Sequence, residues 1–225
     1  MRYVLFCMLV LTGAPAAART LACGGTVAPG LAYPDVSGAW HGLEITLCQK
    51  IAGQIGARAL FTPIMQDSDV PPPGRGRSVI FVPAGDIAPG YLPGPVIYND
   101  NQAIMVPAGS KARDAAALAN AEICVEPGSP EDFNLTAYFA AHKIALREFV
   151  FQETDEMHDA YVAGRCDAIT ARKSLLIGLR ANEGRNDVIL PDNLGDNPIR
   201  AATPAGISGW AALVAHTIKE NTHGL

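Results

Sequence analysis

The second half of the chain alternates between short apolar runs and amphipathic segments of about ten residues. Four apolar runs predict strands, at 122–128, 147–152, 166–171 and 187–191, and three amphipathic segments predict helices, at 129–142, 154–164 and 172–181. Ser129 followed by Pro130 is typical of a helix start. Strands that alternate with helices of this length predict a mostly parallel sheet covered on both faces.

The first half of the chain is less regular. Its predicted elements are a strand that enters a loop at 20–29, a helix at 43–56 and strands at 59–61, 78–85 and 95–109. Within the helix, Cys48, Ile51, Ala52 and Ile55 recur with a spacing that places them on one face, so this stripe is expected to face a core. The triplet Pro71–Pro73 interrupts the strands, because proline lacks the N–H that a helix or central strand needs. The segment around it is expected to be an irregular loop.

The amino terminus has the pattern of a secretory signal peptide. Arg2 precedes a short apolar run that ends in a small-residue track, which predicts cleavage after Ala18. The remainder is long enough for one large domain or two lobes of about 100 residues each, and both remain open. A net charge of −5 with acids and bases interspersed excludes a basic stripe, so neither nucleic acid nor a polybasic membrane anchor is expected.

Four cysteines remain after the signal peptide, namely Cys23, Cys48, Cys124 and Cys166. An even number in an exported chain favours two disulfides, although sequence alone leaves their connectivity open. The chain has no CxxC or HxxxH spacing, so no zinc site is expected, and no cofactor is expected either.

Several segments resemble the periplasmic substrate-binding proteins of polar amino-acid ABC transporters, in particular the general L-amino-acid-binding subfamily of solute-binding protein family 3. In the first half the resemblance lies in Cys23–Gly24, Pro34–Asp35, Trp40 and Leu47–Cys48. In the second half it covers three segments almost continuously, at 123–139, 151–170 and 187–193. Most of the chain beyond the signal peptide resembles this family.

This resemblance implies an α/β protein with the type II periplasmic binding protein fold, in which two lobes close on a ligand like a hinge. The first lobe would comprise 19–106 and 197–225, the second 107–196, with hinge strands near 105–107 and 190–193. Cys124 would pair with Cys166, and Cys23 with Cys48. The protein would be a periplasmic monomer and not an enzyme, and it would deliver a small polar solute to an ABC permease in the inner membrane.

Family members hold an α-amino acid with a first-lobe arginine and second-lobe helix amides on its carboxylate, and an aspartate on its ammonium. Ser129 supplies the helix start. Arg172 stands where the family pattern has the aspartate. In the segment at 71–95, where the family has its first-lobe arginine, this chain has only Arg75 and Arg77, and both are expected on the surface. The candidate ligand-binding residues are Tyr33, Ser129, Arg172 and Ser174.

Three functions follow from these residues. The first is a solute-binding protein with altered specificity, because Arg172 favours an anionic or carboxylate solute. The second is a binding-protein-like periplasmic accessory protein of a quinoprotein dehydrogenase or another partner, because segment 82–100 resembles the corresponding segment of such accessory proteins. The third is a dehydratase-like enzyme on the same fold, in which Glu126 and Glu131 flank the anion site.

Overall fold

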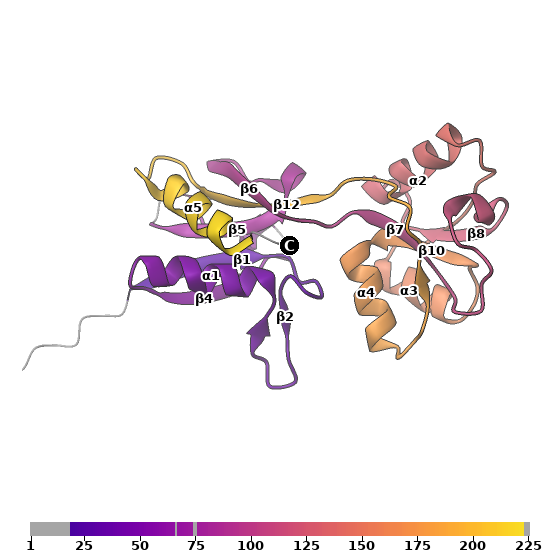
Figure 1. Cartoon of the computed structure of the whole chain (residues 1–225), viewed down its shortest axis with the longest axis horizontal. Helices are drawn as coiled ribbons and strands as arrows, with labels where there is room; N and C mark the ends of the chain where they lie inside the picture. Colours follow the sequence, from indigo (N-terminus) through magenta and orange to yellow (C-terminus); the bar gives the residue numbers. More distant parts are fainter. Residues whose placement is uncertain (1–18, 66, 74–75, 223–225) are drawn as a thin grey trace, which may run out of the picture.

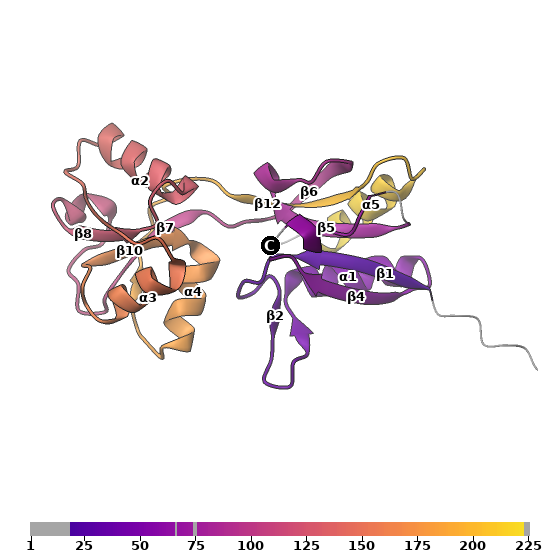
Figure 2. The ribbon, with the colours of Figure 1, turned by 180° about the vertical axis from the view of Figure 1, so that it is seen from behind.

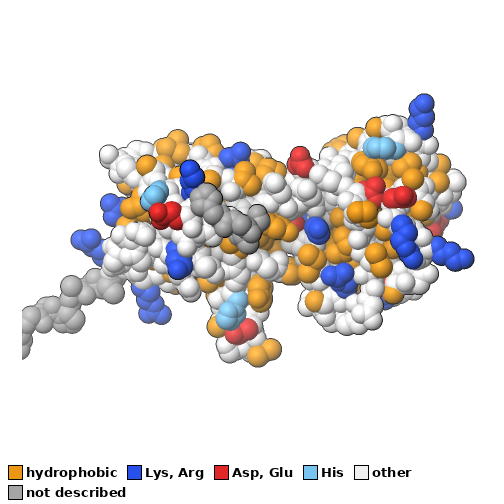
Figure 3. All heavy atoms as spheres, viewed as in Figure 1, with side chains coloured by type: hydrophobic (Ala, Val, Ile, Leu, Met, Phe, Trp, Pro, Cys, Tyr) orange, Lys and Arg blue, Asp and Glu red, His pale blue; other side chains and the backbone are white. Residues whose placement is uncertain are grey.

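The computed structural model describes residues 19–65, 67–73 and 76–222, so the predicted signal peptide lies outside the described residues. Two α/β lobes lie side by side and are joined by two chain crossings (Figures 1 and 2). Among the described residues, no helix has the length and apolar character needed to span a membrane. On the face shown in Figure 3, lysine and arginine side chains are scattered among acidic and apolar ones without forming a stripe.

The first lobe is built on a five-stranded sheet. Its strands, in spatial order, are β4 (Arg58–Pro63), β1 (Thr20–Gly25), β5 (Ser78–Pro83), β12 (Pro198–Pro204) and β6 (Tyr91–Asn99). Two helices, α1 (Leu43–Gln54) and α5 (Trp210–Thr222), pack on one face of this sheet. The predicted stripe of α1 faces this core, where Cys48, Ile51 and Ala52 are buried. Two short 3-10 helices, η1 (Asp67–Asp69) and η2 (Ala84–Asp86), follow β4 and β5.

The second lobe is built on another five-stranded sheet. Its strands, in spatial order, are β11 (Val188–Ile189), β7 (Gln102–Val106), β10 (Ala168–Arg172), β8 (Glu122–Val125) and β9 (Arg147–Val150). Helix α2 (Pro130–Ala141) covers one face, and α3 (Thr154–Val162) and α4 (Lys173–Asn182) cover the other. The predicted parallel arrangement holds for β10, β8 and β9, whereas β7 runs antiparallel to β10 and β11. A 3-10 helix, η3 (Ala115–Leu118), precedes β8.

The two disulfides pair as the family resemblance implies. Cys23 on β1 is bonded to Cys48 on α1, and their Cα atoms are 6.1 Å apart. Cys124 on β8 is bonded to Cys166, just before β10, with Cα atoms 5.7 Å apart. Each disulfide therefore lies within one lobe and ties a strand to its neighbour in the fold.

The first boundary between the lobes falls earlier in the chain than predicted. β7 was expected to end the first lobe, but its backbone pairs with β10 and β11 in the second sheet. The first crossing is therefore the short turn at 99–102, and the second is the segment at 194–198, next to the predicted boundary of 196/197. Backbone hydrogen bonds join the two crossings, from Asp100 N–H to the Asn197 carbonyl at 2.9 Å and from Gln102 N–H to the Gly195 carbonyl at 2.9 Å.

A small hairpin projects from the first lobe, formed by β2 (Tyr33–Pro34) and β3 (Trp40–His41). Asp35 shapes its turn, because one carboxylate oxygen accepts hydrogen bonds from the N–H groups of Ser37 and Ala39 and the other lies 2.8 Å from His41 Nε2. A hydrogen bond from the Ser37 hydroxyl at 2.6 Å, together with the His41 ring and the two N–H groups, holds the pKa of the Asp35 carboxyl well below its usual value. The Pro34–Asp35 pair that contributes to the family resemblance thus has a local structural role.

Candidate functional site

The carboxyl ends of β8 and β10 open onto the side of the second lobe that faces the first. A cavity of about 80 Å³ lies there and is called the polar hollow; it is lined by Glu126, Ser129, Glu131, Thr154, Met157, Thr170, Ala171, Arg172 and Leu175. In open α/β sheets, ligands bind beyond the carboxyl ends of the strands, where loops and helix starts meet. This position makes the polar hollow the candidate site.

Helix α2 directs its amino terminus at the polar hollow. Ser129 is its N-cap, because the Ser129 hydroxyl accepts a hydrogen bond from the Asp132 N–H at 3.1 Å and donates one to the Glu126 carbonyl at 2.7 Å. The Phe133 N–H bonds the Ser129 carbonyl, and Pro130 has no N–H. Among the described residues, the Glu131 N–H finds no acceptor, so it is the amide of the first turn that remains available to an anion.

Arg172 ends β10 and is the N-cap residue of α4. Its Nε atom lies 3.8 Å from the Glu131 Oε1 atom of α2, and each of the two side chains is 26% exposed. Ion pairs with this degree of exposure contribute at most about 1 kcal/mol to stability. Arg172 is therefore held at the hollow by a contact weak enough for a ligand carboxylate to replace.

Asp100 stabilises the start of α4, where two cationic residues, Arg172 and Lys173, are adjacent. The carboxylate of Asp100 accepts hydrogen bonds from the Ser174 N–H at 2.9 Å and from the Ser174 hydroxyl at 2.5 Å. Both residues are buried. A carboxylate at a helix amino terminus compensates the partial positive charge there, so the helix tolerates Arg172 and Lys173. Ser174 thus has its hydroxyl engaged by the first crossing, and it lines neither the polar hollow nor the cavity beside it.

That neighbouring cavity, of about 390 Å³, lies between the lobes beside the two crossings and is called the hinge hollow. It shares Glu131 and Arg172 with the polar hollow and receives Pro83, Gly85 and Asp86 from the first lobe. Its buried wall includes Gln102, whose amide donates to the Glu131 carbonyl at 2.7 Å while its Oε1 atom has no hydrogen-bond partner. The Glu131–Arg172 pair therefore stands between two cavities.

No protein-family model matches the chain. In sequence it is similar to the general L-amino acid-binding periplasmic protein AapJ of Rhizobium johnstonii, with 31% identity over 211 residues, or 87% of this chain and 61% of AapJ. A solved structure, an ABC transporter periplasmic binding protein from Brucella ovis with glutathione bound, has 28% identity and a TM-score of 0.70; the match covers 88% of this chain and 66% of that one.

In sequence and in fold, the chain is similar to periplasmic binding proteins of amino-acid ABC transporters. Its fold is also that of the second substrate-binding domain of a putative amino acid ABC transporter from Streptococcus pneumoniae, with a TM-score of 0.73 and 15% identity over 90% of this chain and 92% of that one. The chain spans about three fifths of the length of AapJ. These proteins are named as binding proteins and not as enzymes, in agreement with the expectation from sequence.

The structure separates the four predicted ligand-binding residues. Ser129 and Arg172 lie together at the polar hollow. Tyr33 lies on the hairpin and lines a different interlobe notch, with Pro29 and α4, while Ser174 is occupied by Asp100. Sequence reasoning missed Asp100, since its only local signal is an acidic residue in a turn between two strands and its partner lies 74 residues away.

Among the residues that the structure describes, the first lobe contributes no arginine or lysine to the two hollows. Arg77 precedes β5 and lies over the Trp210 ring at 5.6 Å, whereas Pro83 at the opposite end of the same strand lines the hinge hollow. A strand of this length separates its ends by about 20 Å. Arg77 therefore lies far from the candidate site, and Arg75 is outside the described residues.

Acidic side chains outnumber basic ones around the site. Glu126 and Glu131 line the polar hollow beside Arg172, and Thr154 donates a hydrogen bond to Glu126 at 3.1 Å. Asp86 and Asp196 add two more carboxylates at the hinge hollow. Among the described residues, no cluster of histidine, cysteine, aspartate or glutamate has the arrangement of a metal site. Unlike charges thus face one another at the site, which suits a solute that carries both.

Proposed function

We propose that this chain is an extracytoplasmic solute-binding protein of an amino-acid-type ABC transporter, and that its solute carries a carboxylate and a positive group. One observation carries this proposal, namely the meeting of the α2 amino terminus, Arg172 and two glutamates in one hollow at the carboxyl ends of β8 and β10. The name of AapJ, a general L-amino acid-binding protein, and the glutathione bound to the Brucella ovis protein support a solute of this class.

The charges define an orientation for such a solute. Its carboxylate lies between the Arg172 guanidinium and the free Glu131 N–H, where a charge-assisted hydrogen bond and the helix dipole both favour an anion. Its ammonium group faces the carboxylates of Glu126 and Glu131. A solute that carries only negative charge is repelled by both glutamates. The site therefore prefers a carboxylate solute that is a zwitterion to one that is a polyanion.

The localisation and the partner belong to the same proposal. Two disulfides and the predicted signal peptide support export to the oxidising periplasm. The protein acts there as a monomer that delivers its solute to an inner-membrane ABC permease. No cofactor takes part in this function.

Calorimetric titration and thermal unfolding of the purified protein test the proposal. The solutes are L-leucine and L-glutamine, with succinate as a dianion and isoamylamine as leucine without its carboxylate. A solute at 100 times its Kd adds about 2.7 kcal/mol to the free energy of unfolding, so a bound amino acid raises Tm measurably. We expect both amino acids to bind and both controls to fail.

Two neighbouring variants isolate the role of Arg172. Arg172→Ala removes a charged hydrogen bond to the carboxylate and should weaken amino-acid binding at least about tenfold. Lys173→Ala removes the adjacent exposed cation, which lines neither hollow, and should change the Kd by less than about twofold. If succinate binds more tightly than leucine, or Arg172→Ala binds leucine normally, the proposed orientation is wrong.

A second candidate, the periplasmic accessory protein, is favoured because the described part of the first lobe places no cation at the two hollows. A protein that no longer holds a solute needs no clamp from both lobes. Absence of binding by every solute in the panel, with a well-folded protein, would support this accessory role and refute transport of amino acids.

A further inference from the structure

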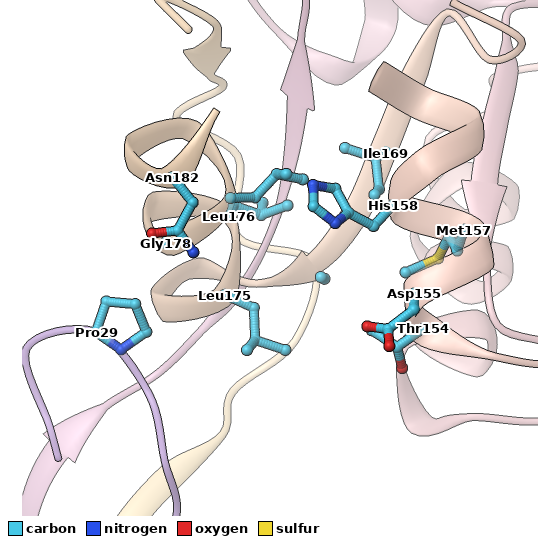
Figure 4. A pocket seen from close by; sticks show the side chains of 12 residues that line it. Pro29, Thr154, Asp155, Met157, His158, Ile169, Leu175, Leu176, Gly178 and Asn182 are labelled. Atoms are coloured by element: carbon cyan, nitrogen blue, oxygen red, sulfur yellow. The ribbon is translucent and has the colours of Figure 1, made fainter. Parts of the chain in front are cut away.

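A third cavity, called the apolar hollow, lies between α3 and α4 and has a volume of about 220 Å³ (Figure 4). It is lined by Pro29, Thr154, Asp155, Met157, His158, Ile169, Ala171, Leu175, Leu176, Gly178, Leu179 and Asn182. The floor comes from β10 and the two walls from the helices, so one lobe supplies every lining residue but Pro29. This cavity has no role in the charge recognition described above.

Hydrocarbon dominates the wall of the apolar hollow. Met157, Ile169 and Leu176 are buried, and Leu175 and Leu179 are partly buried along α4. Figure 4 shows Leu175 and Leu176 directed from α4 toward the space in front of α3. His158 stands in the same space, with an Nε2 atom that makes no hydrogen bond and lies 3.8 Å from Glu183. Such a wall favours an apolar group, because burying hydrocarbon there releases water from both surfaces.

The apolar hollow adjoins the polar hollow. The two share Thr154, Met157, Ala171 and Leu175 among their lining residues. Leu175 follows Arg172 by three positions, so their side chains lie close together at the start of α4, one at each hollow. A molecule with its carboxylate at Arg172 therefore has an apolar surface within reach on the same lobe.

The first lobe closes the far end of the apolar hollow. Pro29 lies so close to Gly178 of α4 that a Cβ atom on Gly178 would be 2.5 Å from the proline Cγ atom. Glycine at this helix position permits the approach, and Pro29 is a lining residue of the hollow. Because the lid and the floor belong to different lobes, separation of the lobes exposes the hollow and their approach covers it.

We infer that the apolar hollow is the side-chain subsite for the solute, and that the preferred solutes are α-amino acids with aliphatic or aromatic side chains. This inference rests on the proposed function and names the class of solute within it. Small-molecule sites usually have volumes of about 300–1,000 Å³, and the polar and apolar hollows together reach the lower end of that range. The two hollows together therefore have a volume that suits a single amino acid.

Titration of the purified protein with L-leucine, L-phenylalanine, L-alanine and L-glutamate tests the inference. All four carry the same charged head, so differences in Kd report on the side chain alone. We expect leucine and phenylalanine to bind at least about tenfold more tightly than alanine, and glutamate to bind least tightly.

Leu175→Asn places an amide at the junction of the two hollows without a large change in volume. It should weaken leucine binding about tenfold and leave alanine binding within about threefold. Leu175→Ala is a second variant that adds no polar group and should weaken leucine binding by a smaller factor. Val150→Asn, an equivalent change at an exposed apolar position on β9 that lines none of the three hollows, should alter neither Kd.

The outcomes separate this inference from the proposed function. Amino-acid binding with no preference for apolar side chains, or an equal loss of alanine and leucine binding in Leu175→Asn, overturns the subsite and leaves solute binding intact. Binding of none of the four amino acids overturns the proposed function and the subsite together. Selective loss of leucine and phenylalanine binding in both Leu175 variants, with Val150→Asn unchanged, establishes the subsite.

Discussion

Gly25 offers a sharp test of how the first lobe is packed. It is the last residue of β1, and a Cβ atom built on it would lie 1.9 Å from Oε2 of Glu44 and 3.2 Å from Cε2 of Phe61. Ordinary contacts between non-bonded heavy atoms lie near about 3.5 Å. The carboxyl of Glu44 must therefore move in Gly25→Ala by more than 1 Å.

Glu44 has little freedom to make that movement. It is fully buried in α1, and neither of its carboxyl oxygens has a hydrogen-bond partner among the described residues. Forcing an extra methyl group into a well-packed core costs about 1–3 kcal/mol. Because Glu44 cannot reach solvent without leaving the core, we expect Gly25→Ala to lower the free energy of unfolding by about 3 kcal/mol.

A double-mutant cycle attributes this loss to the clash. With Glu44→Ala in place the methyl group has room, and Gly25→Ala should then cost less than about 1 kcal/mol, which gives a coupling energy of about 2 kcal/mol. Urea unfolding can be followed by tryptophan fluorescence, because the two tryptophans, Trp40 and Trp210, both lie in the first lobe. A coupling energy below about 0.5 kcal/mol would refute the steric account.

Two further predictions concern buried carboxyls. Burial raises the pKa of Glu44 well above its usual value. The contribution of Glu44 to the stability of the first lobe should therefore be fully present below about pH 4.5 and be lost as the pH rises toward the folded-state pKa. Glu44→Gln should remove this pH dependence from urea unfolding measured between about pH 4 and 8. Asp100→Ala removes the acceptor for the Ser174 N–H and hydroxyl and should destabilise the protein by about 1–3 kcal/mol, whereas the same change at exposed Asp159 should cost less than about 0.5 kcal/mol in thermal unfolding. Equal effects at the two aspartates would contradict the capping role of Asp100.

The acidic residues of the candidate site and of the first lobe differ in their exposure to water. Glu44 is an isolated acid whose pKa is raised by burial, whereas Glu131 is partly exposed and faces Arg172. The Glu131 carboxylate is therefore accessible to a solute. The second lobe therefore holds the charged groups of the site, and the first lobe contributes mainly the lid that includes Pro29.

The elements of the second lobe follow closely from the sequence. The predicted helix at 129–142 spans Pro130–Ala141, and the predicted strand and helix at 166–181 become β10 and α4. These elements depend on local chemistry, namely apolar periodicity and the Ser129 cap. The first lobe was harder to predict, because the chain returns to it only after completing the second lobe. The apolar residues of β12 and α5 therefore pack against β5, β6 and α1, which lie far away in the sequence.

The sequence determined the fold class through short-range patterns and through the family resemblance, which also implied the two lobes, and it singled out Ser129 and Arg172, which meet at the polar hollow. Tertiary structure alone decided the boundary at β7, the hydrogen bonds between Ser174 and Asp100, the contact of Arg172 with Glu131, and the position of the apolar hollow next to the polar one. Each of these depends on which side chains, dozens of residues apart, come within a few ångströms. Hydrogen bonds and packing act over that distance, and a linear pattern does not record it.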